Sequence, residues 1–308
     1  MHRISDYKII QIKSDQPKEV IDYGVRMAGA PLEWGEVTGE GVRVGIIDTG
    51  IDLRHRDLAD GISDAISFVS GVRSPQDDNG HGTHVAGIIG ARKNGTGVVG
   101  MAPGCSLYVA KAFDANGNAE FPAIYKSLEW MIRKRVQIVN MSFSSDEPSK
   151  GYEEILKAAN AHGITLICAA GNEGSRRRNT IGYPGKFPQT IAVTAVDPSR
   201  RTTEFSSAGY ESELCAAGVD IYSTYPGNSY AKLSGTSMAT PIISGAAALM
   251  QAKGMYRYRR YLSPKEVRFL LHLYTEDLGG KGWDPYFGYG LFSFGRLDKS
   301  DFIEDLKF

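Results

Sequence analysis

The sequence predicts an α/β protein with a mostly parallel central sheet and helices on both faces. Continuous apolar runs alternate with helix-like segments: the runs are 42–47, 107–110, 138–141 and 164–169, and the segments are 81–92, 122–134 and 152–162. Continuous apolar strands are typical of a sheet buried on both faces, and their alternation with helices is typical of parallel sheets. The 308 residues could form one large domain or two small ones, and motifs spread along most of the chain favour one.

Segment 236–252 predicts a helix of another kind. It is apolar almost all round, which is typical of a helix buried in the interior rather than at the edge of a fold. Pro241 near its start is compatible with a helix because a missing backbone donor is tolerated in the first turn. We therefore expect a buried helix through the middle of the domain.

Charge and composition exclude several classes of partner. Lys plus Arg number 35, as do Asp plus Glu, so no overall field favours nucleic acid or an anionic membrane. No apolar run approaches membrane-spanning length, and charges interrupt the first fifteen residues before a signal peptide could form. The three cysteines, Cys105, Cys168 and Cys215, cannot all pair within the chain. A reducing compartment, the cytoplasm, is the predicted location.

Three distant motifs carry the residues of a nucleophilic site. Asp48 closes V-G-I-I-D-T-G, His81 opens a helix in N-G-H-G-T-H-V-A-G, and Ser237 opens another in G-T-S-M-A-T-P. Each motif alone is weak evidence for a catalytic site, since an Asp at the end of a strand more often forms a turn or caps a helix than takes part in catalysis. Together a carboxylate, an imidazole and a hydroxyl are what charge-relay chemistry requires.

The order of these motifs and their flanking glycines resembles the subtilisin family of serine proteases over about residues 19–297, most closely the bacterial intracellular subtilisins. The resemblance implies a subtilisin-like three-layer fold. It also implies that Ser237 attacks a peptide carbonyl, His81 transfers the proton and Asp48 orients the imidazole. In A-A-G-N-E-G, Asn172 matches the oxyanion-hole residue, beside the amide of Ser237.

The same resemblance implies that substrate binds as an extra strand between two segments. The segments are Gly117, Asn118, Ala119 and Ser142, Phe143, Ser144. The primary pocket is expected between Ser142–Ser144 and Ala169, Ala170, Gly171, with Gly182 as its floor. A glycine floor predicts a preference for large apolar side chains. Because S-F-S-S replaces the family's usual S-L-G-G at 142–145, a narrower pocket is also open as an interpretation, owing to the added hydroxymethyl group of Ser144.

His84 leaves a second interpretation open. His81 and His84 lie three apart on one helical face and could share a metal. No H-E-x-x-H motif or nearby third ligand accompanies them, however. The family resemblance instead makes His84 a buried, hydrogen-bonded supporting residue.

By the same resemblance, a structural Ca²⁺ is expected on the loop A-R-K-N-G-T-G-V. Oxygen ligands would come from Asn94, Asp57, Glu19 and the carbonyls of Arg92, Thr96 and Val98. The alternative is an ion-free tight loop, since Arg92 and Lys93 bring two positive charges. A second, weaker cation site is implied at Gly185, Phe187 and Thr190, with Tyr183-Pro184 as a cis peptide.

Regulation is also implied by the resemblance. Residues 1–18 would be an inhibitory extension lying across the active site, 19–297 the catalytic domain and 298–308 a tail that takes part in a homodimer. The strand-like Y-K-I-I-Q-I-K is the expected blocking segment, although Ile9-Ile10-Gln11-Ile12 stands where the family's inhibitory motif has a proline.

The predicted function is that of a serine endopeptidase with broad specificity, acting on protein or peptide substrates and restrained by its own N-terminal extension. Two alternatives remain open: a processing peptidase devoted to one precursor, and a noncatalytic peptide-binding module. The module would be expected to lack a triad residue or Asn172, and all four are present. The arginine run at 176–178 is interpreted as a solvated loop or as a contact for acidic substrate residues.

Overall fold

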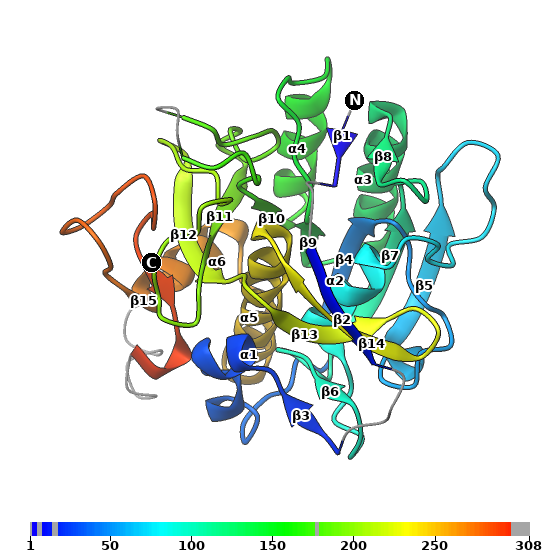
Figure 1. Cartoon of the computed structure of the whole chain (residues 1–308), viewed down its shortest axis with the longest axis horizontal. Helices are drawn as coiled ribbons and strands as arrows, with labels where there is room; N and C mark the ends of the chain where they lie inside the picture. Colours follow the sequence, from blue (N-terminus) through cyan, green and yellow to red (C-terminus); the bar gives the residue numbers. More distant parts are fainter. Residues whose placement is uncertain (1, 5–7, 14–17, 176–178, 297–308) are drawn as a thin grey trace.

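The computed structural model describes residues 2–4, 8–13, 18–175 and 179–296. Its centre is a nine-stranded sheet in which every neighbouring pair is parallel except the edge pair β15–β16 (Figure 1). In spatial order the strands are β15 (Thr275–Glu276), β16 (Leu291–Phe292), β12 (Ser212–Ala217), β11 (Thr190–Val196), β10 (Thr165–Ala169), β9 (Ile138–Met141), β4 (Arg43–Asp48), β7 (Ser106–Lys111) and β5 (Ile62–Ser67). The predicted mostly parallel sheet is confirmed.

Both faces of this sheet are covered by helices. The α-helices are α1 (Tyr23–Met27), α2 (His81–Gly90), α3 (Phe121–Lys134), α4 (Tyr152–Ala161), α5 (Thr236–Tyr258) and α6 (Pro264–Leu273), and the short 3₁₀ helices are η1 (Ala30–Leu32), η2 (Ala59–Gly61) and η3 (Phe294–Arg296). Helices α2, α5 and α6 pack on one face, and α3 and α4 pack on the other. This is the three-layer arrangement expected from the sequence.

Successive residues of the central strands belong to different cores. In β4, Ile46 joins the core under α2 and α5, whereas Ile47 joins the core under α3 and α4. Ile138 and Val139 of β9 divide in the same way. Side chains alternate across a strand, so a strand buried on both faces needs apolar residues at every position. This requirement explains the continuous apolar runs.

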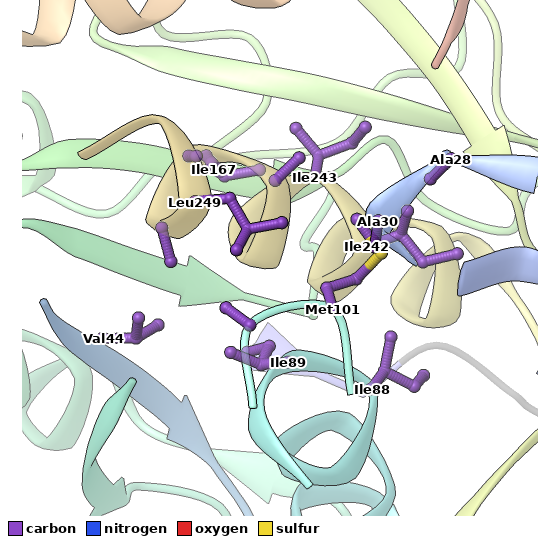
Figure 2. Close-up of a cluster of buried hydrophobic side chains, with 14 of the residues drawn as sticks. Ala28, Ala30, Val44, Ile88, Ile89, Met101, Ile167, Ile242, Ile243 and Leu249 are labelled. Atoms are coloured by element: carbon purple, nitrogen blue, oxygen red, sulfur yellow. The ribbon is translucent and has the colours of Figure 1, made fainter. Parts of the chain in front are cut away.

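Helix α5 crosses the interior, as its composition predicts. Figure 2 shows Ile242, Ile243 and Leu249 of α5 in one cluster with Ile88 and Ile89 of α2. The helix extends six residues beyond the predicted end at 252. Polar residues there are held by tertiary contacts, since buried Lys253 forms an ion pair with buried Glu33.

Among the described residues, three smaller sheets accompany the central one. They are β1 (His2–Arg3) with β8 (Asn118–Ala119), β3 (Val20–Ile21) with β6 (Val98–Val99), and β13 (Ile221–Tyr225) with β14 (Ser229–Ser234) and β2 (Lys8–Lys13). The sequence alone did not predict these pairings. Two of the three recruit residues from the first thirteen, so the N-terminal segment is part of the folded surface (Figure 1).

In the part of the chain that the structure describes, no helix combines the length and the apolar character needed to cross a membrane. The predicted tail at 298–308 and the arginine run at 176–178 lie outside the described residues.

Candidate active site

Asp48 and His81 are brought into contact at one edge of the central sheet. Asp48 is the last residue of β4, and His81 is the first residue of α2. The His81 Nδ1–H donates to Asp48 Oδ1 at 2.8 Å, and both side chains are fully buried. A proton on Nδ1 leaves Nε2 of the neutral ring as a base, which is the tautomer that proton abstraction requires.

Ser237 lies at the same edge of the sheet, at the start of helix α5. It is the second residue of α5, and its hydroxyl donates to the carbonyl oxygen of Ser142, which directly follows β9. Strand β9 is the sheet neighbour of β4, which ends at Asp48. Adjacent parallel strands end at the same edge, so this contact places Ser237 beside the Asp48–His81 pair.

Pro241 influences the first turns of α5. It lies in the second turn rather than the first, and its missing N–H leaves the carbonyl of Ser237 without the usual helical donor. The hydroxyl of Ser142 donates to that carbonyl at 3.0 Å instead. The exchange of two hydrogen bonds between these serines fixes the start of α5 against the end of β9.

Asn172 is oriented by the residue before the nucleophile. Its Oδ1 accepts hydrogen bonds from the amide and the hydroxyl of Thr236, at 3.0 and 2.9 Å. A methyl group on Gly235 would lie 3.1 Å from Asn172 Nδ2 and 3.7 Å from the Ser237 amide nitrogen. Two donors thus lie on the same side of Gly235, the arrangement of an oxyanion hole.

The first turn of α2 is held by a residue that sequence reasoning missed. Asp77 accepts hydrogen bonds from the hydroxyl of Thr49 (2.9 Å), the amides of Asn79 (3.0 Å) and Gly80 (2.9 Å), and the amide and hydroxyl of Thr83 (2.9 and 2.6 Å). The Thr49 hydroxyl also accepts from the amide of Gly82 at 2.9 Å. The residue after Asp48 is thereby connected to the helix that carries His81. An Asp shortly before a helix is a capping signal that could have identified this residue.

A buried ammonium group lies beside this network. Lys111 is the register partner of Asp48 in β7, and its Nζ donates to the carbonyl of Thr49 at 2.6 Å and to Asp78 at 2.6 Å. Burial of a charge is tolerated only where such partners replace water. Lys111 therefore fixes the turn that follows Asp48.

His84 is a supporting residue in the structure. Its Nε2–H is shared between the carbonyls of Ile221 (2.9 Å) and Ala231 (3.1 Å), which connects α2 to the β13–β14 hairpin. Complete burial lowers the pKa of His84 to about 3, so the ring is neutral at ordinary pH. Among the described residues no group of three His, Cys, Asp or Glu side chains is placed to hold a metal. This arrangement favours the supporting role over zinc.

The two segments expected to bind substrate already hold a strand between them, and that strand is the chain's own. His2 and Arg3 pair antiparallel with Ala119 and Asn118. Arg3 exchanges two backbone hydrogen bonds with Ser144, each 3.3 Å, and the Ile4 amide donates to the carbonyl of Gly117 at 2.9 Å.

The expected blocking segment is therefore placed differently from the prediction. Residues 8–13 of Y-K-I-I-Q-I-K form β2, which pairs with β14 rather than with either substrate segment. Residues 2–4 lie between those segments instead. Backbone pairing needs no particular side chains, so apolar patterning could not distinguish the two stretches.

The expected pocket walls also come together. The amide of Gly182 donates to the carbonyl of Ala170 at 2.9 Å, and the amide of Gly171 donates to the Thr236 hydroxyl at 3.2 Å. Phe143 and Ala169 are buried behind these surfaces. The floor and one wall are thus joined to each other and to the residue before the nucleophile.

Three of the expected calcium ligands face one loop. Asp57 accepts from Asn94 Nδ2 (3.2 Å), the Val98 amide (2.9 Å) and the Tyr230 hydroxyl (3.0 Å). Glu19 accepts from the Gly95 amide at 2.8 Å. All these donors are neutral, so two carboxylates remain without a cation among the partners named here.

The positive charges of this loop are directed elsewhere. The Arg92 guanidinium donates to the carbonyls of Pro103 and Asp60, and Lys93 Nζ lies 5.7 Å from the centre of the Trp34 ring. The hydroxyl and amide of Thr96 donate to Asn94 Oδ1. The residues fit a calcium ion if Asn94 rotates its amide so that Oδ1 replaces Nδ2.

At the second expected cation site, protein groups donate hydrogen bonds to two of the expected ligand residues. The carbonyl of Phe187 accepts from the amide (3.0 Å) and hydroxyl (2.9 Å) of Thr190. The Arg268 guanidinium donates to the carbonyl of Thr190 and, at 3.0 Å, to that of Pro188. Gly185 is buried next to the cis peptide Tyr183–Pro184, which the structure confirms. A metal ion here would have to displace these donors.

Comparison with known proteins agrees with this geometry. Residues 39–290 match the model of the subtilase family. Subtilisin DY of Bacillus licheniformis is 42% identical over 275 residues, covering 89% of this chain and 97% of that protein. Subtilisin E of Bacillus subtilis is 44% identical over 236 residues, which cover 76% of this chain and 61% of that protein. An intracellular serine protease of Paenibacillus polymyxa is 39% identical over 274 residues, which cover 87% of this chain and 84% of that protein. The chain belongs to the subtilase family and is a subtilisin-like serine endopeptidase.

Proposed function

We propose that the chain hydrolyses peptide bonds through Ser237, His81 and Asp48. The observation that carries this proposal is the buried 2.8 Å contact between Asp48 and His81 at the sheet edge where α5 begins. For the reaction, the hydroxyl of Ser237 turns from the Ser142 carbonyl to His81 Nε2.

Each step follows from the positions of these groups. Ser237 Oγ attacks the substrate carbonyl while Nε2 takes its proton, and Asp48 stabilises the resulting imidazolium. The carbonyl oxygen becomes an oxyanion, which accepts hydrogen bonds from Asn172 Nδ2 and the Ser237 amide. His81 then donates the proton to the leaving amine, and water hydrolyses the acyl-enzyme by the reverse sequence.

A phosphonate that reacts with activated serines tests this assignment. The full chain should be labelled, and Ser237→Ala should neither be labelled nor hydrolyse peptides. In subtilisin the equivalent loss lowers kcat by about 10⁶. Asn172→Ala should still be labelled, with kcat lower by about 10²–10³. Labelling of Ser237→Ala would refute the assigned nucleophile.

We also propose that residues 2–4 inhibit the enzyme by occupying the position of a substrate strand. The support is the pairing of Arg3 with Ser144 and of Ile4 with Gly117, which uses the backbone groups that a peptide would need. His2 is buried among the rings of Phe121, Phe143 and Tyr152, at centroid distances of 6.0, 6.2 and 5.3 Å. On this proposal residues 1–18 regulate and 19–297 catalyse.

We further propose that a structural Ca²⁺ binds at Glu19, Asp57 and Asn94. These residues join the segment that precedes α1 to the loop after α2, so a bound ion would connect the N-terminal part of the chain to the helix of His81. The ion would take no part in bond cleavage. Its expected effect is on stability.

Cytoplasmic protein turnover with broad specificity is the proposed setting. The P. polymyxa relative is named an intracellular protease, and all three cysteines of this chain are free and buried. Backbone pairing in the groove favours acceptance of many sequences at positions outside the primary pocket. A homodimer is part of the same proposal, and sedimentation of the Ser237→Ala chain tests it.

A further inference from the structure

We infer that Ser144 closes the primary specificity pocket to large side chains, so that this enzyme cleaves after small residues such as Gly, Ala or Ser. The inference rests on the proposed function, because it concerns which side chain the same site accepts. It replaces the large apolar preference that a glycine floor suggests.

The side chain of Ser144 lies between the floor and the opposite wall. A methyl group on Gly182 would lie 2.7 Å from Ser144 Cβ and 3.4 Å from its Oγ. A methyl group on Gly171 would lie 3.3 Å from the same Oγ. The Ser144 hydroxymethyl group therefore occupies space that bare backbone leaves open at both glycines.

The opposite wall cannot move back to restore that space. Gly171 has φ +113°, which favours glycine, and a methyl group on it would lie 2.9 Å from the Ser207 hydroxyl. The Ser207 amide donates to the Gly171 carbonyl at 2.9 Å, and its hydroxyl accepts from the Glu173 amide at 3.2 Å. Gly171 is thus held by a hydrogen bond from a buried serine.

Rotation of the Ser144 side chain does not open the pocket either. The backbone of Ser144 is held through both its N–H and its C=O by the strand in the groove, now Arg3 and during catalysis the substrate. Rotation about χ1 moves Oγ but leaves Cβ in place, and Cβ makes the 2.7 Å approach to the Gly182 position. The restriction is therefore set by the backbone.

Small and large side chains should be distinguished strongly by such a pocket. A difference of one methylene in a well-formed pocket changes kcat/KM by about 10–200-fold. An alanine side chain ends at Cβ and does not reach the region between Gly171 and Gly182. A leucine or phenylalanine side chain would need the volume that Ser144 fills.

The test uses the full chain and four p-nitroanilides, Ala-Ala-Pro-Xaa with Xaa as Gly, Ala, Leu or Phe. These peptides differ only in the residue that enters the pocket, so inhibition by the N-terminal strand affects all four alike. The wild type should cleave the Ala peptide with the highest kcat/KM. Ser144→Gly should raise the Phe-to-Ala ratio by at least about tenfold.

The adjacent serine provides a matched control. Ser145 Oγ donates to the carbonyl of Glu147 at 3.0 Å, and it is not among the three atoms nearest to a methyl group placed on Gly171 or Gly182. Ser145→Gly should leave the Phe-to-Ala ratio unchanged. If Ser144→Gly fails to fold, Ser144→Thr tests the same claim in the opposite direction, with a further fall in the Leu-to-Ala ratio.

A wild type that prefers Phe or Leu would overturn the inference, as would an unchanged ratio in folded Ser144→Gly. If the proposed function itself is wrong, the hydrolysis assay gives a different result. In that case no peptide of the series would be hydrolysed by any variant, including those with glycine at position 144.

Discussion

Ser142 and Ser237 exchange hydrogen bonds in both directions: the Ser237 hydroxyl donates to the Ser142 carbonyl, and the Ser142 hydroxyl donates to the Ser237 carbonyl. The second bond exists because Pro241 has no N–H to offer that carbonyl. The end of a central strand and the start of the nucleophile's helix are thus joined at the residue that performs the chemistry.

Ser142→Ala should destabilise the fold. The variant leaves the buried carbonyl of Ser237 without the donor that replaces the missing N–H of Pro241, at a cost of about 1–3 kcal/mol. Urea unfolding in a Ser237→Ala background, which excludes self-digestion, measures the change. Ser145→Ala is the control, since its hydroxyl bonds only a local carbonyl. Equal midpoints for the two variants would contradict the prediction.

Asp77→Asn should impair activity and stability together. An amide group in place of Oδ2 would face the N–H and hydroxyl of Thr83, so the first turn of α2 would lose its cap. Loss of such a cap costs about 0.5–2 kcal/mol. A shift of His81 by about 1 Å would lower kcat/KM by about 10²-fold. Asp64→Asn, at an exposed ion pair with Lys134, is the matched control and should change neither quantity.

His84 should make stability depend on pH below about 6.5. The unfolded chain binds a proton on this ring near its ordinary pKa of 6.5, whereas burial keeps the folded ring neutral down to about 3. Stability should therefore fall as pH falls across this range, by up to about 1.4 kcal/mol per pH unit from this group.

His84→Gln keeps a side-chain donor but does not titrate. Its free energy of unfolding should change less steeply between pH 6.5 and 4.5, as measured by urea unfolding at several pH values. A wild type that gains stability on acidification relative to this variant would show the sign to be wrong.

Arg3→Pro should release the groove. Proline cannot donate to the Ser144 carbonyl, and loss of about 1 kcal/mol of binding by the inhibitory strand raises activity about fivefold. Initial rates of peptide hydrolysis measure this effect. Arg3→Ala keeps the backbone bond and serves as control, and a chain that starts at Glu19 sets the upper limit. Equal rates for all four proteins would argue against inhibition by this segment.

Calcium should raise the melting temperature of the Ser237→Ala chain. At a free concentration about 100-fold above Kd, a single site stabilises by about 2.7 kcal/mol. Melting is compared in CaCl₂ and in EDTA, with MgCl₂ as control. Asp57→Asn should reduce the difference between the two conditions. Identical melting curves for the Ser237→Ala chain in calcium and in EDTA would rule out the site.

The sequence predicts the parts of this fold that depend on local pattern. Apolar runs located β4, β7, β9 and β10 to within one residue at either end, and the alternation of strands with helices gave the parallel sheet. Strand β5 was missed because charged and half-exposed positions interrupt its apolar pattern. Its place in the sheet comes from pairing with β7, which has no local signal.

Contacts between residues far apart in the sequence account for most of the remaining differences between the predicted and the observed structure. The last turns of α5 depend on Lys253 meeting Glu33, and the carbonyl of Thr190 is bonded by Arg268 from another helix. The motif residues at the active site could be chosen from sequence because glycine and strand-end chemistry surround them. Thr49, which helps to position two of these residues, is recognised only from its hydrogen bond to Asp77, whereas Asp77 itself carries the sequence signal of a helix cap.

The burial of α5 also determines how this enzyme would lose activity over time. A nucleophile on a surface loop could lose its alignment while the remainder of the molecule stayed intact. Here the helix that begins at Thr236 is enclosed by the sheet on one side and by α2 and α6 around it, so its first turn cannot loosen without opening the interior. Catalytic competence and the native state should consequently decay with a single lifetime, with no long-lived population of folded but inert molecules.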